Sequence, residues 1–114
     1  MIEIIVLSYI QRMTEIPTFL EEPERPPEKY VIVEKVGSTY ANRFDGAVIA
    51  VQSYAPTLLE AAELSRAIKQ HMHRLPELVE AVTHCSCTGD YNYTDTQTHR
   101  YRYQAVYSIN YYEE

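Results

Sequence analysis

The feature that most constrains this chain is a regular alternation of side-chain types over residues 99–111. Aromatic or small apolar residues occupy every second position, namely Tyr101, Tyr103, Ala105, Tyr107, Ile109 and Tyr111. The positions between them, with Val106 as the exception, are polar: Arg100, Arg102, Gln104, Ser108 and Asn110. Because successive side chains of a strand point to opposite faces, this pattern predicts one long strand with an apolar and a polar face. Such a strand belongs in a sheet that is covered on one side.

Two segments have the three- and four-residue spacing of amphipathic helices. The first covers residues 2–13. The second is predicted to begin after Thr57, because Thr57 and Glu60 have the spacing of a capping box. Its apolar stripe is Leu58, Ala61, Ala62, Leu64, Ile68, Met72 and Leu75. Pro76 either breaks this helix or opens a short further turn of helix through Ala81.

Three further segments are predicted to be strands of ordinary length. Residues 30–36 are rich in β-branched side chains, and we expect the strand to end at Gly37. Residues 42–54 are apolar on both faces, with Phe44, Val48 and Ala50 on one and Ala47, Ile49 and Val51 on the other, which favours a central place in the sheet. Residues 82–87 are the third strand, followed by a predicted turn at residues 88–90.

The segment after the first helix is predicted to hold a short strand at residues 18–20 and then an exposed loop at residues 21–28. That loop contains three prolines, which remove backbone donors and forbid helix. The element order is therefore helix, three strands, helix, two strands. We predict an α+β fold, one domain over residues 1–114, with a mostly antiparallel four- to five-stranded sheet and two helices packed on one face.

The net charge argues against a protein that reads DNA or RNA. The net charge is −6, from 16 acidic against 10 basic residues, so there is no general basic surface for a phosphate backbone.

Residues 1–7 are apolar but include Glu3, and neither a signal peptide nor a membrane span is expected there.

Histidine and cysteine residues raise the question of a metal site. On a helix, His71 and His73 are about 200° apart and cannot hold one ion together. On a strand, Cys85 and Cys87 share a face, whereas His84 points the other way. No CxxC pair is present. We therefore expect two small buried thiols in a reducing compartment, and no metal ligand.

Catalytic motifs are equally scarce. Cys87 with His71 or His99 could formally be a nucleophile and its base, but no third group selects that pair. With three glycines the chain has no phosphate-binding loop, and it has neither a GxSxG nor an HExxH motif. Asp90 and Asp95 are better explained by turn chemistry than by acid–base catalysis. We expect no enzymatic activity, no catalytic residue and no cofactor.

Tyrosine is the compositional outlier, because seven of the 11 lie in residues 91–112. A ring with a polar end suits half-buried sheet faces and protein interfaces, so Tyr91, Tyr93 and Tyr112 are candidate contacts for neighbouring subunits. Arg100 and Arg102, together with these tyrosines, could form a stacking platform for single-stranded nucleic acid. Since the chain is acidic, we instead expect them to pair with acids across the strand or across a subunit contact.

The proline-containing loop has a second interpretation. Its acidic side chains Glu21, Glu22 and Glu24 either lie in solvent or form a docking arm toward a partner. They complete the set of candidate interaction residues.

The order of several segments resembles a known family. These segments are residues 30–37 (YVIVEKVG), 42–45, 47–55 (AVIAVQSYA), the helix with Ala62 and Leu64, and residues 91–95 leading to 102–107 (RYQAVY). Over residues 17–112 the chain resembles the tail terminator proteins of long-tailed bacteriophages and prophages, also called tail completion or head-tail joining proteins.

The resemblance implies a structural protein of the virion tail, made in the cytoplasm of the bacterial host. Such a protein forms a hexameric ring on the head-proximal end of the tail tube, stops tube polymerisation and docks on the head-tail connector. DNA passes through the ring without sequence-specific binding, and no membrane is involved. A neck or head-completion protein of the same particle, and a small ligand-binding or regulatory α+β domain, remain the alternatives.

Overall fold

The alternating segment forms β5 (Tyr101–Tyr111), which lies between β3 (Phe44–Ala55) and β4 (Val82–Asn92). The five-stranded sheet has the order β1-β2-β3-β5-β4, in which β1 (Thr18–Phe19) is parallel to β2 (Tyr30–Ala41) and all other pairs are antiparallel. The structure is a computed structural model that describes residues 1–41 and 44–112. The predicted α+β class and the central place of β3 are confirmed, while the expected start of that strand at Asn42, before Phe44, lies outside the described residues.

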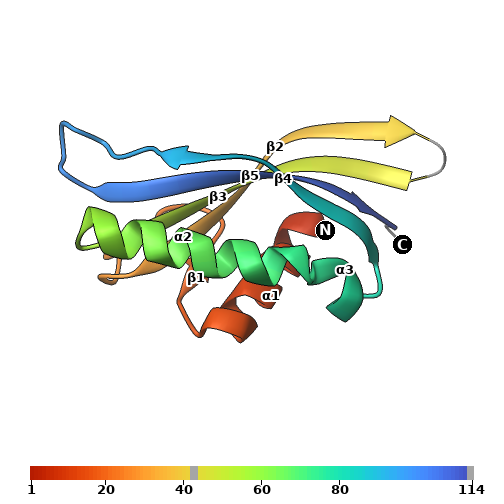
Figure 1. Ribbon diagram of the computed structural model, residues 1–114, viewed down its shortest axis with the longest axis horizontal. Coiled ribbons are helices and arrows are strands. Elements are labelled where there is room, and N and C mark those ends of the chain that lie inside the picture. The colour runs from red at the N-terminus through yellow and green to blue at the C-terminus, as the bar shows by residue number, and fades with distance from the viewer. Residues whose placement is uncertain (42–43, 113–114) are drawn as a thin grey trace.

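The helices lie against one face of the sheet and leave the opposite face bare (Figure 1). They are α1 (Ile2–Thr14), α2 (Leu58–His73) and α3 (Leu75–Leu78). The two long helices are those predicted from the sequence. Of the two interpretations of Pro76, a break or a short further helix, the second is confirmed, because Pro76 lies in the first turn of α3. This helix ends at Leu78 and does not reach Ala81. The chain thus has a helical layer and a sheet layer. On the face without helices, a small second cluster of Tyr30, Ile32 and Tyr54 is also buried, with Phe19 packed against it.

The core fills the space between these layers. On β5 the side chains of Ala105, Tyr107, Ile109 and Tyr111 are all buried on the helix-covered face. They pack with aliphatic side chains of α1, α2, β2 and β3, including Val6, Ile10, Val31, Val33, Ile49, Val51, Ile68 and Met72. The predicted apolar face of β5 is therefore confirmed over its second half, whereas Tyr101 is 36% exposed.

Local interactions fix both long helices. The backbone N–H of Glu60 donates to Thr57 Oγ1 at 3.2 Å and the Thr57 hydroxyl donates to Glu60 Oε2 at 3.1 Å, so the predicted cap of α2 is confirmed. The Tyr9 hydroxyl of α1 donates to the carbonyl of His71 at 2.6 Å and joins α1 to the end of α2. Burial raises the pKa of Tyr9, which keeps this donor protonated.

The predicted end of a strand at Gly37 is wrong, because β2 continues to Ala41. Lys35 pairs with Ile49 and Gly37 pairs with Val48, so the intervening Val36 is an unpaired bulge residue. Gly37 does not have a positive φ. A β-bulge accommodates one extra residue, here Val36, and the pairing of the two strands resumes after it. The strand therefore continues through Gly37.

The predicted turn at residues 88–90 is also a bulge, and β4 continues to Asn92. Cys87 pairs with Tyr107 and Gly89 pairs with Val106, which leaves Thr88 unpaired. The Thr88 hydroxyl donates to the carbonyl of Val106 at 3.3 Å. Turn-forming residue types at this place therefore bend an edge strand without ending it.

Two tyrosines of β5 test the position of the core. Tyr107 and Tyr101 occupy the same face of the same strand, but Tyr107 is 1% exposed and Tyr101 is 36% exposed. We expect Tyr107→Ala to lower the free energy of unfolding by about 3 kcal/mol or more, because it leaves a cavity in the core. Tyr101→Ala is expected to cost less than about 1 kcal/mol. Urea unfolding followed by circular dichroism measures both, and equal losses would contradict this placement of the core.

Candidate functional site on the open face of the sheet

Aromatic and arginine side chains gather on the bare face of the sheet, at the end where β5 begins. We call this the arginine–tyrosine surface, and it consists of Phe19, Tyr30, Tyr54, Tyr91, Tyr93, Arg100 and Arg102. The register explains why they meet, because Tyr30 pairs with Tyr54 and Tyr54 pairs with Arg102 across three neighbouring strands. The residues that alternate with them along the strands, such as Val31 and Ala105, point to the other face and lie in the helix-covered core.

The centre of the surface is a stack that crosses the strands and is itself buried, since Tyr30 is 3% and Tyr54 is 6% exposed. The rings of Tyr30 and Tyr54 are parallel within 4° and their centroids are 4.4 Å apart. The Arg102 guanidinium carbon is 5.8 Å from the Tyr54 centroid and 4.4 Å from the Tyr93 centroid. Phe19 meets the edge of Tyr30 at 6.3 Å. The Arg102 charge thus lies between two electron-rich ring faces, an attractive arrangement for a cation.

Arg102 is also fixed by hydrogen bonds. Its Nη1 donates to the Tyr54 hydroxyl at 2.9 Å and its Nε donates to the carbonyl of Tyr93 at 2.6 Å. Since a guanidinium group is planar and always charged, these contacts define its orientation. The orientation of Arg102 is therefore fixed by contacts within the chain.

Arg100 and Glu22 join the proline-containing loop to this stack. The Arg100 guanidinium carbon lies 5.2 Å from the Tyr54 centroid and 5.8 Å from the Tyr30 centroid. Its Nη2 forms an ion pair with Glu22, whose carboxylate also accepts a hydrogen bond from the Tyr30 hydroxyl at 2.6 Å. Arg100 therefore pairs with an acid as expected, but that acid lies in the loop and not across the strand. For Arg102 the predicted acid pairing is wrong within the described residues, because its contacts are with Tyr54 and Tyr93.

A second polar row borders the stack. Gln52 Nε2 donates to Gln104 Oε1 at 2.8 Å, and Gln104 Nε2 donates to the Tyr91 hydroxyl at 2.6 Å. The rings of Tyr91 and Tyr93 meet edge to face at 5.9 Å. Tyr91 and Tyr93 are each 44% exposed, so they form the accessible rim of the surface.

The connection between β4 and β5 holds the arginines in place. Asp95 and Arg100 form an isolated bridge, in which the Asp95 N–H donates to the Arg100 carbonyl at 3.2 Å. His99 has a φ of 55°, an unusual left-handed conformation that lets the chain turn directly before Arg100. The backbone N–H of Gln97 donates to Asp95 and lowers the pKa of that carboxyl, which keeps the turn acceptor ionised.

The structure brings five of the predicted interaction residues together, namely Tyr91, Tyr93, Arg100, Arg102 and Glu22. The other three lie elsewhere. Glu21 and Glu24 are exposed in the loop, and Tyr112 is 53% exposed beyond the far end of β5, beside Ala81. Tyr91, Tyr93 and Tyr112 are all exposed, and their role as subunit contacts stays a prediction.

Sequence reasoning missed the middle of the surface. Tyr30 and Tyr54 were assigned only to strands, although they form its central stack. The available signal was their equivalent position at the two paired ends of neighbouring strands. Reading that signal required the strand register, which the sequence alone does not define.

The residues of the metal hypothesis lie apart from this surface. Cys85 and Cys87 face the helices, whereas His84 pairs with Asn110 on the bare face. In residues 1–41 and 44–112, no three or more histidine, cysteine or acidic side chains are grouped so that they could hold a metal ion.

Comparison of the chain with protein-family models and with curated proteins finds no match. Within the part of the chain that the structure describes, no helix has the length and apolarity needed to cross a membrane. The arrangement combines exposed tyrosine rings with two arginine guanidinium groups, and tyrosine and arginine are residue types enriched in protein interfaces.

A double-mutant cycle tests the central contact of the surface. We expect Arg102→Met and Tyr93→Leu to show a coupling free energy of about 0.5–1 kcal/mol in urea unfolding, because both variants remove the same cation–π contact. The matched control is Arg102→Met with Tyr112→Leu, which lie at opposite ends of β5 and should be additive. Equal coupling in the two cycles would contradict the stack.

Proposed function

We propose that this protein is a structural subunit of a phage or prophage tail. In this proposal it forms a ring on the head-proximal end of the tail tube, stops polymerisation of the tube and joins it to the head-tail connector. The observation that carries the proposal is the arginine–tyrosine surface on the uncovered face of the sheet. The resemblance of residues 17–112 to tail terminator proteins supplies the particular assembly.

The composition of the surface favours a protein partner. Large, stiff tyrosine rings lose little conformational entropy on binding, and arginine adds directional hydrogen bonds. Arg100 is already paired with Glu22, and the chain carries a net charge of −6. Single-stranded nucleic acid needs a positively charged groove beside its stacking platform, and this surface does not offer that excess of charge.

The edges of the sheet fit a subunit that adds to further copies. Within the described residues β4 pairs only with β5, and β1 covers only two residue pairs of β2, which starts at Tyr30 and ends at Ala41. Free strand edges and an uncovered face are liabilities in a monomer. A closed ring made by one repeated heterologous contact covers them without leaving an open end.

A neck or head-completion subunit would use the same kind of contact. The two assignments differ in the partner, because a tail terminator binds the tail tube protein and a neck protein does not. Binding to the tube protein of the same phage genome therefore separates them.

The test measures assembly in variants of the surface. We expect native mass spectrometry to show self-association at high protein concentration or on addition of the tube protein. The double variant Tyr93→Ala/Arg102→Ala should weaken assembly by about tenfold or more, since it removes two interface side chains. Tyr112→Ala is the matched control, because it removes an exposed tyrosine from the other end of β5.

Two outcomes would count against the proposal. A protein that stays monomeric both alone and with the tube protein is not a ring subunit. Equal assembly by the wild type and by a folded Tyr93→Ala/Arg102→Ala variant would remove the arginine–tyrosine surface from the contact.

A further inference from the structure

A cavity lies between α2 and the edge strand β4, on the face of the sheet opposite the arginine–tyrosine surface. Its volume is about 530 Å³, within the range of about 300–1,000 Å³ that is usual for small-molecule sites. The helix contributes Arg66, Lys69 and His73 to the wall, and the sheet contributes Cys85, Cys87 and Tyr107 to the floor. The cavity therefore combines a cationic rim with a floor that carries no formal charge when its thiols and phenol are protonated.

The rim carries more positive than negative charge. Lys69 Nζ forms an ion pair with Asp90 at 2.5 Å, and Arg74 Nε lies 3.6 Å from a Glu77 oxygen. Among the side chains that the structure describes, none forms an ion pair with Arg66. In a protein with a net charge of −6, this arginine is a local surplus of positive charge at the cavity mouth.

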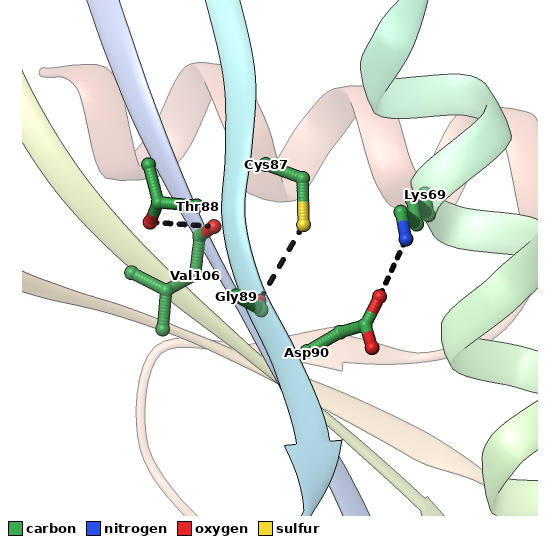
Figure 2. Close-up of polar contacts among 6 residues, drawn as sticks. All are labelled: Lys69, Cys87, Thr88, Gly89, Asp90 and Val106. Carbon is green, nitrogen blue, oxygen red and sulfur yellow. Dashed lines mark hydrogen bonds and ion pairs between the residues drawn. The ribbon is translucent and has the colours of Figure 1, made fainter.

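The bulge at Thr88 shapes the floor. Figure 2 shows the Thr88 side chain turned toward Val106, while Cys87 and Asp90 point toward α2. Because one residue is unpaired, side chains at positions 87 and 90 reach the same side of β4. The Lys69–Asp90 ion pair then bridges helix and strand, as Figure 2 also shows. Without the bulge, alternation would point Asp90 to the bare face.

The two thiols give the floor its apolar character. Cys87 Sγ donates to the carbonyl of Gly89 at 3.4 Å, so this thiol has a partner within its own strand. Burial raises the pKa of Cys85 to about 12, which keeps its thiol neutral at physiological pH. A neutral buried cysteine behaves as a small hydrophobic residue.

At the cavity, Tyr107 has a buried polar group that no described residue pairs with. Its side chain is 1% exposed, and its hydroxyl is buried with no hydrogen-bond partner among the described residues. Burial also raises its pKa, which keeps the hydroxyl a donor. Tyr107 lines the cavity together with Cys85 and Cys87. An unpaired buried donor is costly, and a ligand oxygen in the cavity would satisfy it.

We propose that this cavity binds a small amphipathic organic anion, a carboxylate with a short apolar body. The carboxylate accepts hydrogen bonds from the Arg66 guanidinium at the mouth and from the Tyr107 hydroxyl in the floor. The apolar body packs on the Cys85 and Cys87 side chains. This site is independent of the proposed assembly surface, because it lies on the other face of the sheet.

Octanoate is the probe, and isothermal titration calorimetry is the measurement. Octanoate should bind with one site per chain, because it combines the charge and the alkyl body that the cavity requires. Two controls separate these contributions: 1-octanol has the body without the charge, and inorganic phosphate has the charge without the body. Both should bind at least about tenfold more weakly than octanoate.

Variants locate the binding. Arg66→Gln should weaken octanoate binding by about tenfold, since it removes a charge-assisted hydrogen bond. Arg25→Gln is the matched control, an exposed arginine of the proline-containing loop, and should bind octanoate like the wild type. Tyr107→Phe should weaken binding by about threefold to tenfold while raising the melting temperature of the free protein, because it removes the unpaired hydroxyl.

The proposal is overturned by any of three results. These are no octanoate binding at millimolar concentration, equal binding of octanoate and 1-octanol or phosphate, and octanoate binding that a folded Arg66→Gln variant leaves unchanged.

Discussion

The pairing of β3 with β5 is the interaction on which the rest of this structure depends. The two strands pair without a register break from Asp45 opposite Tyr111 to Ala55 opposite Tyr101. An unbroken antiparallel ladder fixes the face of every side chain along both strands, because a shift of one residue would exchange the two faces. Val51 and Ala105 therefore lie in the core beneath the helices. On the same ladder, the residues of the other parity form the bare face.

The sequence predicts the helix-covered face of the sheet better than it predicts the bulges and the bare face. The alternation around Tyr107 predicts a two-faced strand and a covered sheet, because burial of one face imposes a period of two on the residues themselves. The bulges at Val36 and Thr88 leave no such periodic trace, so both were interpreted as strand ends. Of the candidate interaction residues, Arg100 and Arg102 lie in the stack, and Tyr91 and Tyr93 form its rim. Tyr30 and Tyr54 become the centre of the surface through strand order, which is a long-range property that no local pattern encodes.

The two faces of the sheet support different chemistry. The bare face holds rings and guanidinium groups that orient one another, with Tyr91 and Tyr93 exposed and Tyr30 and Tyr54 buried. Such rigidity would lower the entropic cost of the proposed protein contact. The covered face leaves a cavity where α2 passes the bulged edge strand, and the buried Tyr107 hydroxyl there has no hydrogen-bond partner in the part of the chain that the structure describes. The proposed protein contact and the proposed anion site are therefore independent, because they lie on opposite faces of the sheet.

Hydroxyl-radical footprinting of the tyrosines tests whether the arginine–tyrosine surface is a protein contact. Tyr91, Tyr93 and Tyr112 are all exposed in the free chain, so all three should be oxidised in the monomer. In the assembled protein, alone or with its tube partner, the account predicts that Tyr91 and Tyr93 lose most of their oxidation while Tyr112 keeps it. Unchanged oxidation of Tyr91 and Tyr93 in the assembled protein would contradict the account.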